Sequence, residues 1–156
     1  MENKEPFLIR TAVPGDLETL LGFEQGIVAA ERPFDSTLRE GTIHYYDLGS
    51  LLLSPLTKVL VAQLGNQVIG SGFARIETAK PYLKLDRYAY LGFMYVEPAY
   101  RGLGVNRAIL NGLKEWAVSQ EIYELRLEVY QQNEPARKAY EKAGFSAHVL
   151  EMRMRL

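Results

Sequence analysis

The strongest constraint on this chain is a glycine-containing turn that separates an apolar run from an amphipathic stretch. Residues 90–96 predict a buried strand, and residues 105–119 carry apolar side chains at helical spacing. A strand that turns through glycines into a helix N-terminus presents unpaired backbone N–H groups and the positive end of the helix dipole. Gly102 and Gly104 carry no Cβ, so a ligand can approach the backbone closely. The turn therefore predicts an anion site, and a pyrophosphate is the usual occupant of such a site.

Two familiar phosphate loops do not fit this turn. A dinucleotide-binding loop needs a third glycine at the position of Arg107 and lies near the first strand, whereas this turn comes late in the chain. A Walker loop needs Gly-Lys-Ser/Thr, a tripeptide that the sequence does not contain. A glycine turn alone is also compatible with a plain junction between a strand and a helix, so a second signal is needed.

The second signal is a short predicted helix downstream, within residues 133–145. Asn133 is a favourable N-cap, Pro135 fits the first turn, and Gly144 stops the helix. Tyr140 is the only polar side chain that reaches out from one otherwise shallow face, so it is either a site residue or a half-buried core residue. That face consists of Ala136, Ala139, Tyr140 and Ala143.

Together, the two segments resemble the GCN5-related N-acetyltransferase (GNAT) superfamily. The matching patterns are Val-x-Pro-x-Tyr followed by Arg-Gly-x-Gly-x-x, and then Asn-x-x-Ala-x-x-x-Tyr-Glu-Lys-x-Gly-Phe. They span about residues 94–145, a third of the chain. The resemblance implies one α/β (α+β) domain over residues 1–156. In it a mixed, mostly antiparallel central sheet is flanked by helices, and its strands are splayed at the acetyl-CoA site.

The activity that this resemblance implies is transfer of an acetyl group from acetyl-CoA, a co-substrate, to a primary amine by direct attack, with no metal. The acceptor is expected to be a small amine, an amino-acid-like molecule or a peptide N-terminus. Two alternatives stay open: a non-catalytic acyl-CoA sensor, and an acyltransferase for a longer acyl-CoA, which would need room near Gly92 and Phe93.

The resemblance also assigns cofactor-binding residues. Asn106 and Leu103 depart from the family, which usually has Gly or Ala at the first position and often a basic residue at the second. Asn133 is expected to bond to the cofactor, which competes with its use as an N-cap. The full expected set is Met94, Val96, Arg101, Gly102, Leu103, Gly104, Val105, Asn106 and Asn133.

Two catalytic residues are expected by the same resemblance. Tyr140 is expected to protonate or hydrogen-bond the departing thiolate, and Glu128 to help remove the proton of the amine, directly or through water. Glu128 lies in a Leu-Glu-Val segment twelve residues before Tyr140, as in the ribosomal-protein N-terminal acetyltransferases. The alternative role for Glu128 is a structural ion pair with an arginine such as Arg75, and Glu77 and Glu97 are weaker candidates for the base.

The acceptor pocket is expected, again by resemblance, between residues 27–46 and 79–87. No strongly acidic groove is evident from the sequence. The polar and aromatic side chains of these segments are Glu31, Arg32, Phe34, Asp35, His44, Tyr45, Tyr46 and Tyr82.

Periodicity predicts the remaining elements. A helix starts after Pro14-Gly15-Asp16 with Leu17, Leu20, Leu21 and Phe23 facing inward, and a second helix ends near Ser54. Strands are expected at residues 7–12, 58–64, 67–78, 88–96 and 123–130, with a hairpin at Gly65-Asn66 and a helix at 105–119. The alternating tail, 148–156, predicts a final strand, and with only 12 residues after Gly144 it favours pairing with a second copy in a homodimer.

Composition limits the partners. With a net charge of −1, the chain does not favour nucleic acid or an anionic membrane as a partner. It contains no cysteine, its two histidines show no ligand spacing, and its first residues do not resemble a signal peptide. These features predict a cytoplasmic protein.

Overall fold

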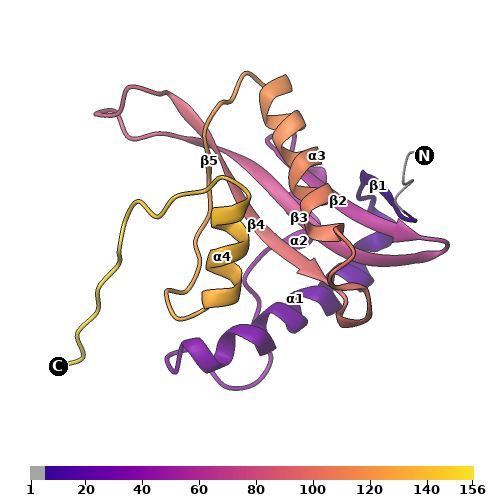
Figure 1. The fold of residues 1–156 in the computed structure, drawn as a ribbon, viewed down its shortest axis with the longest axis horizontal. Coiled ribbons are helices and arrows are strands. Elements are labelled where there is room, and N and C mark those ends of the chain that lie inside the picture. Colours follow the sequence, from indigo (N-terminus) through magenta and orange to yellow (C-terminus); the bar gives the residue numbers. More distant parts are fainter. Residues whose placement is uncertain (1–5) are drawn as a thin grey trace.

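A computed structural model describes residues 6–156 and shows a five-stranded sheet with helices on both faces (Figure 1). The strands are β1 (Leu8–Thr11), β2 (Thr57–Leu64), β3 (Gln67–Thr78), β4 (Arg87–Val96) and β5 (Leu125–Arg126). The α-helices are α1 (Leu17–Glu31), α2 (Leu48–Leu53), α3 (Val105–Ser119) and α4 (Glu134–Lys142). Short 3-10 helices cover Pro14–Asp16, Arg32–Phe34 and Pro98–Tyr100.

The strands lie in the sheet in chain order, β1 to β5. The first four pair antiparallel, and β4 and β5 pair parallel. The tight turn between β2 and β3 contains Gly65, whose φ of 58° lies in the left-handed region that glycine adopts without strain. The sheet is therefore mixed and mostly antiparallel, which confirms the predicted fold class.

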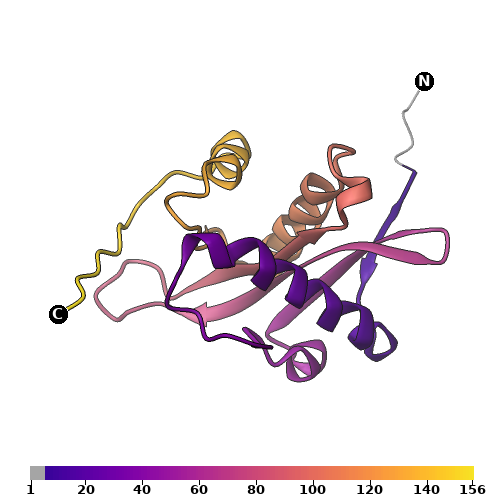
Figure 2. The ribbon, with the colours of Figure 1, turned by 90° about the horizontal axis from the view of Figure 1, so that it is seen from below.

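Two apolar cores lie on opposite faces of the sheet. One face packs against α3 through buried side chains that include Ile109 and Leu113. The other face packs against α1 and α2, where Leu20, Phe23 and Leu48 are buried. Figure 2 shows α1 on one side of the sheet and α3 with α4 on the other. Both faces are covered, as the apolar content of the strands requires.

The first helix begins at a carboxylate. Arg10, on β1, donates to both carboxylate oxygens of Asp16 at 2.8 and 2.9 Å, and the backbone N–H of Val13 donates to the same carboxylate at 2.8 Å. These bonds fix the end of β1 to the start of α1. Of the side chains predicted to face inward, Leu20 and Phe23 are buried, but Leu21 is exposed because it lies on the other side of the helix from Leu20 and Phe23.

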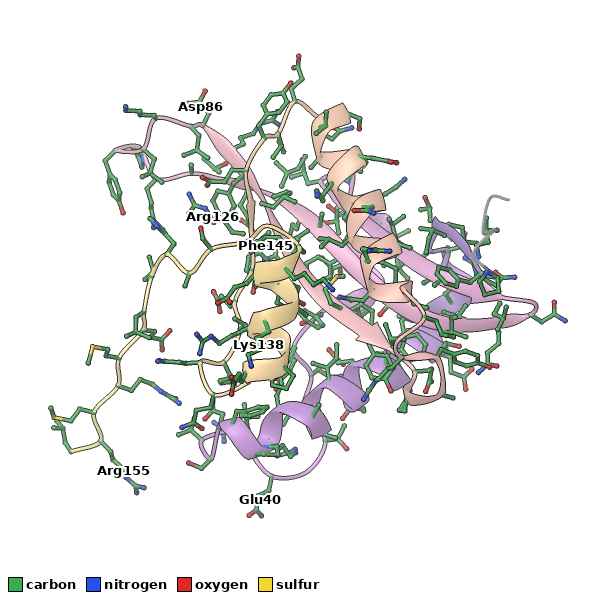
Figure 3. All side chains as sticks on the ribbon, viewed as in Figure 1. Glu40, Asp86, Arg126, Lys138, Phe145 and Arg155 are labelled. Atoms are coloured by element: carbon green, nitrogen blue, oxygen red, sulfur yellow. The ribbon has the colours of Figure 1, made fainter. Side chains whose placement is uncertain are left out.

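Two predicted strands are wrong or too long. Residues 123–130 were expected to form one strand, but only Leu125 and Arg126 pair with β4. The tail, 148–156, forms no strand, because no neighbouring strand of the described chain supplies partners for its backbone. It runs away from α4 with exposed side chains, and Figure 3 shows Arg155 far from Phe145 and the rest of the domain. Arg153 connects the tail to the domain, because its guanidinium donates to Thr37 Oγ1 at 3.1 Å and lies 3.4 Å from Asp35.

Candidate active site

A backbone irregularity in β4 begins the site. β3 and β4 shift register between Ser71 and Phe73, and Phe93 has a φ of 58°, which is rare for a residue other than glycine. Side chains bond to the backbone groups of Phe93: Ser71 Oγ donates to its carbonyl at 3.1 Å, and its N–H donates to Tyr46 Oη at 3.3 Å. The register shift is therefore a β-bulge that hydrogen bonds stabilise, and it changes the direction of the end of β4.

After Tyr90, β4 and β5 no longer pair. Their pairing is limited to Ala89 with Leu125 and Tyr90 with Arg126. The end of β4 and the segment after β5 then form opposite walls of a cavity of about 500 Å³, which α4 and the C-terminal end of α1 complete. The space lies between two strands that no longer pair, so an extended ligand with amide groups could bond to a strand edge there.

Nearly all of the predicted site residues line this cavity. Leu103 does not line it and is 54% exposed, because its side chain points out of the turn. The predicted residues that do line the cavity are Met94, Val96, Arg101, Gly102, Gly104, Val105, Asn106, Glu128, Asn133 and Tyr140.

The glycine turn places the N-terminus of α3 at one end of the cavity. Gly102 and Gly104 have φ values of 81° and 83°, and Gly104 is the N-cap residue of α3. A Cβ at these φ values is strained, so glycine is required there by the backbone as well as by any ligand. Arg101 Nε donates to the Val96 carbonyl at 3.0 Å, which ties the turn to the end of β4. The first N–H groups of a 15-residue helix therefore face a cavity that also carries a guanidinium.

Asn133 combines the two roles that seemed to compete. Its Oδ1 accepts from the Ala136 N–H at 3.4 Å, as an N-cap of α4. The side-chain amide also carries two N–H groups, and these donate to no residue in the described part of the chain. The same side chain can therefore cap the helix and donate a hydrogen bond into the cavity.

Tyr140 reaches the cavity from the middle of α4. Its ring packs edge-on against Phe145, with ring centroids 5.8 Å apart. Burial raises the pKa of the Tyr140 hydroxyl, and the negative charge of Glu31 raises it further. A phenol with a raised pKa stays protonated at neutral pH, so Tyr140 is a hydrogen-bond donor toward the cavity.

Glu128 lies at the exposed edge of the cavity, on the segment that follows β5. The predicted alternative, an ion pair with Arg75, is not formed: Arg75 Nε lies 2.6 Å from Glu77 on its own strand. Within residues 6–156, Glu128 forms no ion pair at all. The Glu128 carboxylate is therefore available to a ligand or to water.

Of the two segments expected to form the acceptor pocket, only residues 27–46 reach this cavity. Glu31, from the segment 27–46, lines the cavity, and Asp35 lies close by, because its Oδ2 accepts from Tyr130 Oη at 3.0 Å. Residues 79–87 lie elsewhere: Tyr82 is 82% exposed, and this loop borders a separate hollow formed with residues 121–124. The loop was misplaced because it extends from the opposite ends of β3 and β4.

Sequence reasoning missed one buried carboxylate that supports the site. Glu24, in α1, is fully buried and accepts from the backbone N–H groups of Tyr45 and Tyr46 at 3.0 Å each. His44 Nδ1 lies 2.6 Å from the same carboxylate. Glu24 thereby fixes the segment that carries Tyr46 beneath Phe93. Apolar residues at helical spacing in α1 place position 24 on the buried face. This spacing was the sequence signal from which the burial of Glu24 could have been predicted.

Residues 6–156 contain neither a metal-binding cluster nor a membrane-spanning helix. There is no cluster of three or more His, Cys, Asp or Glu side chains suited to a metal ion. The helices of this range include none that is long and apolar enough to cross a membrane.

The fold and the cavity define a class: an α/β protein whose mixed sheet opens beside a helix N-terminus. The sequence profile of the Acetyltransferase (GNAT) family matches residues 27–145, and the chain belongs to this family. Membership supports an acyl-transfer enzyme.

Two relatives and one solved structure illustrate the range of similarity. A glucosamine 6-phosphate N-acetyltransferase from Trypanosoma brucei brucei is 30% identical over 102 residues, covering 65% of this chain and 66% of that protein. The uncharacterized protein ML0378 from Mycobacterium leprae is 27% identical over 92% of this chain and 35% of its own length. The chain thus spans less than two thirds of each of these curated relatives. A crystal structure of a predicted acetyltransferase with acetyl-CoA from Clostridium acetobutylicum shares the fold, with a TM-score of 0.71, 21% identity and 96% coverage of both chains.

Proposed function

We propose that this protein is an N-acetyltransferase that moves the acetyl group of acetyl-CoA to a primary amine. One observation carries the proposal: a single cavity brings together the N-terminus of α3, the gap between β4 and β5, and the Tyr140 hydroxyl. The crystal structure with acetyl-CoA from Clostridium acetobutylicum, which has the same fold, supports the choice of donor.

The residues present fit acetyl-CoA. The turn from Arg101 to Asn106 offers backbone N–H groups, the helix dipole and one guanidinium to a diphosphate. The end of β4 at Met94 offers a strand edge to the amides of the pantetheine arm, and Asn133 offers its free amide N–H groups from the opposite wall. Bound there, acetyl-CoA would supply the acetyl group as a thioester.

Side chains of the protein then have separate roles in the reaction. The neutral amine nitrogen forms a bond to the acetyl carbon, and the carbon–sulfur bond breaks with its electrons on sulfur. Glu128, directly or through water, accepts the proton that the amine loses, and solvent receives it afterwards. Tyr140 donates a hydrogen bond to the departing sulfur, which then takes up a proton as free CoA.

The packing near β4 favours a short acyl group. Phe93 is buried, and a Cβ placed on Gly92 would lie 2.7 Å from the Phe73 ring. This part of the sheet is filled by the protein itself, so it offers no space for a longer acyl chain.

The test is release of the free CoA thiol from acetyl-CoA across a panel of amines, amino acids and N-terminal peptides, with the acetylated product identified by mass spectrometry. We expect turnover with at least one class of primary amine. Tight binding of acetyl-CoA without turnover of any acceptor would contradict the proposal and would favour the acyl-CoA sensor instead.

A further inference from the structure

The charges that line the cavity are divided between its two ends. The charged side chains among the lining residues are Arg101, Glu31 and Glu128. Arg101 lies beside the glycine turn, at the end suited to a diphosphate. Glu31 comes from the last turn of α1 and Glu128 from the segment after β5, so the remaining part of the cavity carries two carboxylates and no basic side chain.

Neither carboxylate is neutralised within residues 6–156. Glu31 and Glu128 form no ion pair there, whereas the neighbouring Asp35 lies 3.4 Å from the guanidinium of Arg153. Glu31 is half-buried, and burial raises the pKa of its carboxyl group, with a further contribution from the charge of Asp35. A partly buried carboxylate without a counter-ion is stabilised by any cation that binds beside it.

Tyrosine side chains line the same cavity as Glu31, among them Tyr130 and Tyr140. After burial, the negative charge of Glu31 is among the causes that raise the pKa of five tyrosine hydroxyl groups. They are Tyr45, Tyr46, Tyr90, Tyr130 and Tyr140. The buried Tyr45 hydroxyl lies close enough to the Glu31 carboxyl group to lower its pKa, against the effect of burial. An aromatic ring in the same cavity can add a cation–π contact to an organic cation that binds beside the carboxylate.

We propose that the acceptor carries two amino groups, one that is acetylated beside Glu128 and one that stays cationic beside Glu31. This inference rests on the proposed function and names its substrate class. The reacting nitrogen must lose its proton, so a carboxylate that bound only that nitrogen as an ammonium ion would stabilise the unreactive form. A second carboxylate is useful when a second positive charge persists through the reaction.

The same charges disfavour a phosphorylated acceptor. The relative from Trypanosoma brucei brucei is a glucosamine 6-phosphate N-acetyltransferase. A phosphate at the acceptor end of this cavity would meet Glu31 and Glu128, whereas Arg101, the basic side chain among the lining residues, lies at the other end, beside the glycine turn. The acceptor of this chain is therefore distinct from the acceptor of that relative.

The test compares putrescine with butylamine, which has the same carbon chain and one amino group. Glucosamine and glucosamine 6-phosphate form a second pair. We expect kcat/KM to be about 10- to 100-fold higher for putrescine than for butylamine, the range of one charge-assisted contact. Glu31→Gln should remove this preference through KM, and Glu31→Asp should retain part of it. Glu18→Gln, an exposed site on the same helix, should keep it. In the second pair, kcat/KM should be lower for glucosamine 6-phosphate than for glucosamine.

Binding of putrescine by calorimetry, in the presence of CoA, separates this inference from the proposed function. Putrescine that binds the native protein and not Glu31→Gln supports the second cation site, even if no acetyl transfer occurs. Turnover of butylamine and putrescine with equal kcat/KM would overturn the diamine inference while the acetyltransferase proposal stands. Equal losses for both amines in Glu31→Gln, or faster turnover of glucosamine 6-phosphate than of glucosamine, would also overturn it.

Discussion

Tyr140 is the residue on which the chemistry of the cavity depends most. Its hydroxyl group has a pKa raised by burial, above the ordinary value of 10.0, whereas a free thiol has a pKa near 8.5. Full transfer of the Tyr140 proton to a thiolate is therefore uphill, and a hydrogen bond to the developing charge is the favoured role. Since this bond forms mainly in the transition state, Tyr140→Phe should lower kcat by about 10²-fold with little change in acetyl-CoA affinity.

The matched control is Tyr82→Phe, because Tyr82 is 82% exposed and does not line the cavity. Steady-state kinetics of both variants, with an acceptor that the native protein uses well, give the comparison. Near-native kcat in Tyr140→Phe would show that Tyr140 is only a core residue of α4.

Glu128 is tested by the pH dependence of the rate. If its carboxylate accepts the amine proton, Glu128→Gln should lower the rate most at pH values below the pKa of the amine. Raising the pH should then recover part of the loss, because more of the amine is already neutral. Glu115→Gln, at an exposed site on α3, should leave the profile unchanged. A loss of the same size at every pH would indicate a role in acceptor binding instead.

At the scale of elements, the junction of β1 and α1 depends on the Arg10–Asp16 pair. The bonds from Arg10, together with the Val13 N–H, hold the pKa of Asp16 below its ordinary value of 3.8. Because the pKa of Asp16 is lower in the folded than in the unfolded protein, its carboxylate stabilises the fold at pH values above the pKa of the unfolded state. This stabilisation is lost as the pH falls through the pKa of the folded state. Asp16→Asn should therefore lower the free energy of unfolding by about 1–3 kcal/mol at pH 7.

Denaturant unfolding of the native protein and of Asp16→Asn at several pH values measures this effect. The difference between the two proteins should shrink steadily below pH 3.8, since the native carboxyl group is then protonated as well. A difference that does not vary with pH would mean that packing around position 16, and not the charge, stabilises the junction.

Elements with local signals were predictable from the sequence, and elements that depend on distant partners were not. The helix at residues 105–119 and the N-cap at Asn133 agree with the structure, because spacing and capping residues act within a few positions. The alternation of apolar and polar side chains at residues 123–130 and 148–156 was not sufficient to predict strands there. A strand needs a neighbour to pair with, and β4 turns away after Tyr90 and Arg126 have paired.

At the scale of the whole molecule, the cavity joins elements from both halves of the chain. The glycine turn, Asn133 and Tyr140 could be predicted together because they lie in two motifs close in sequence. Glu31 lies about a hundred residues before Glu128, and only the approach of α1 to the segment after β5 brings them to one cavity. The acidic character of the acceptor end therefore could not be deduced from either segment alone.

Two expectations about the whole molecule stay predictions. One is that residues 1–156 form a single domain, and the other is that the protein forms a homodimer. The exposed apolar side chains of the tail, which include Val149, Met152 and Met154, are compatible with a second copy covering this segment.

The central claim is that the turn at the N-terminus of α3 binds acetyl-CoA, and thermal unfolding with and without acetyl-CoA tests it most directly. At about 100 times its dissociation constant, acetyl-CoA should raise the Tm of the native protein by about 5–10 °C. Gly104→Val should abolish this shift. Gly41→Val, at a residue with a similar φ of 81° and equally open surroundings, should retain it, because that loop is outside the cavity. An acetyl-CoA shift of native size in Gly104→Val would contradict the account.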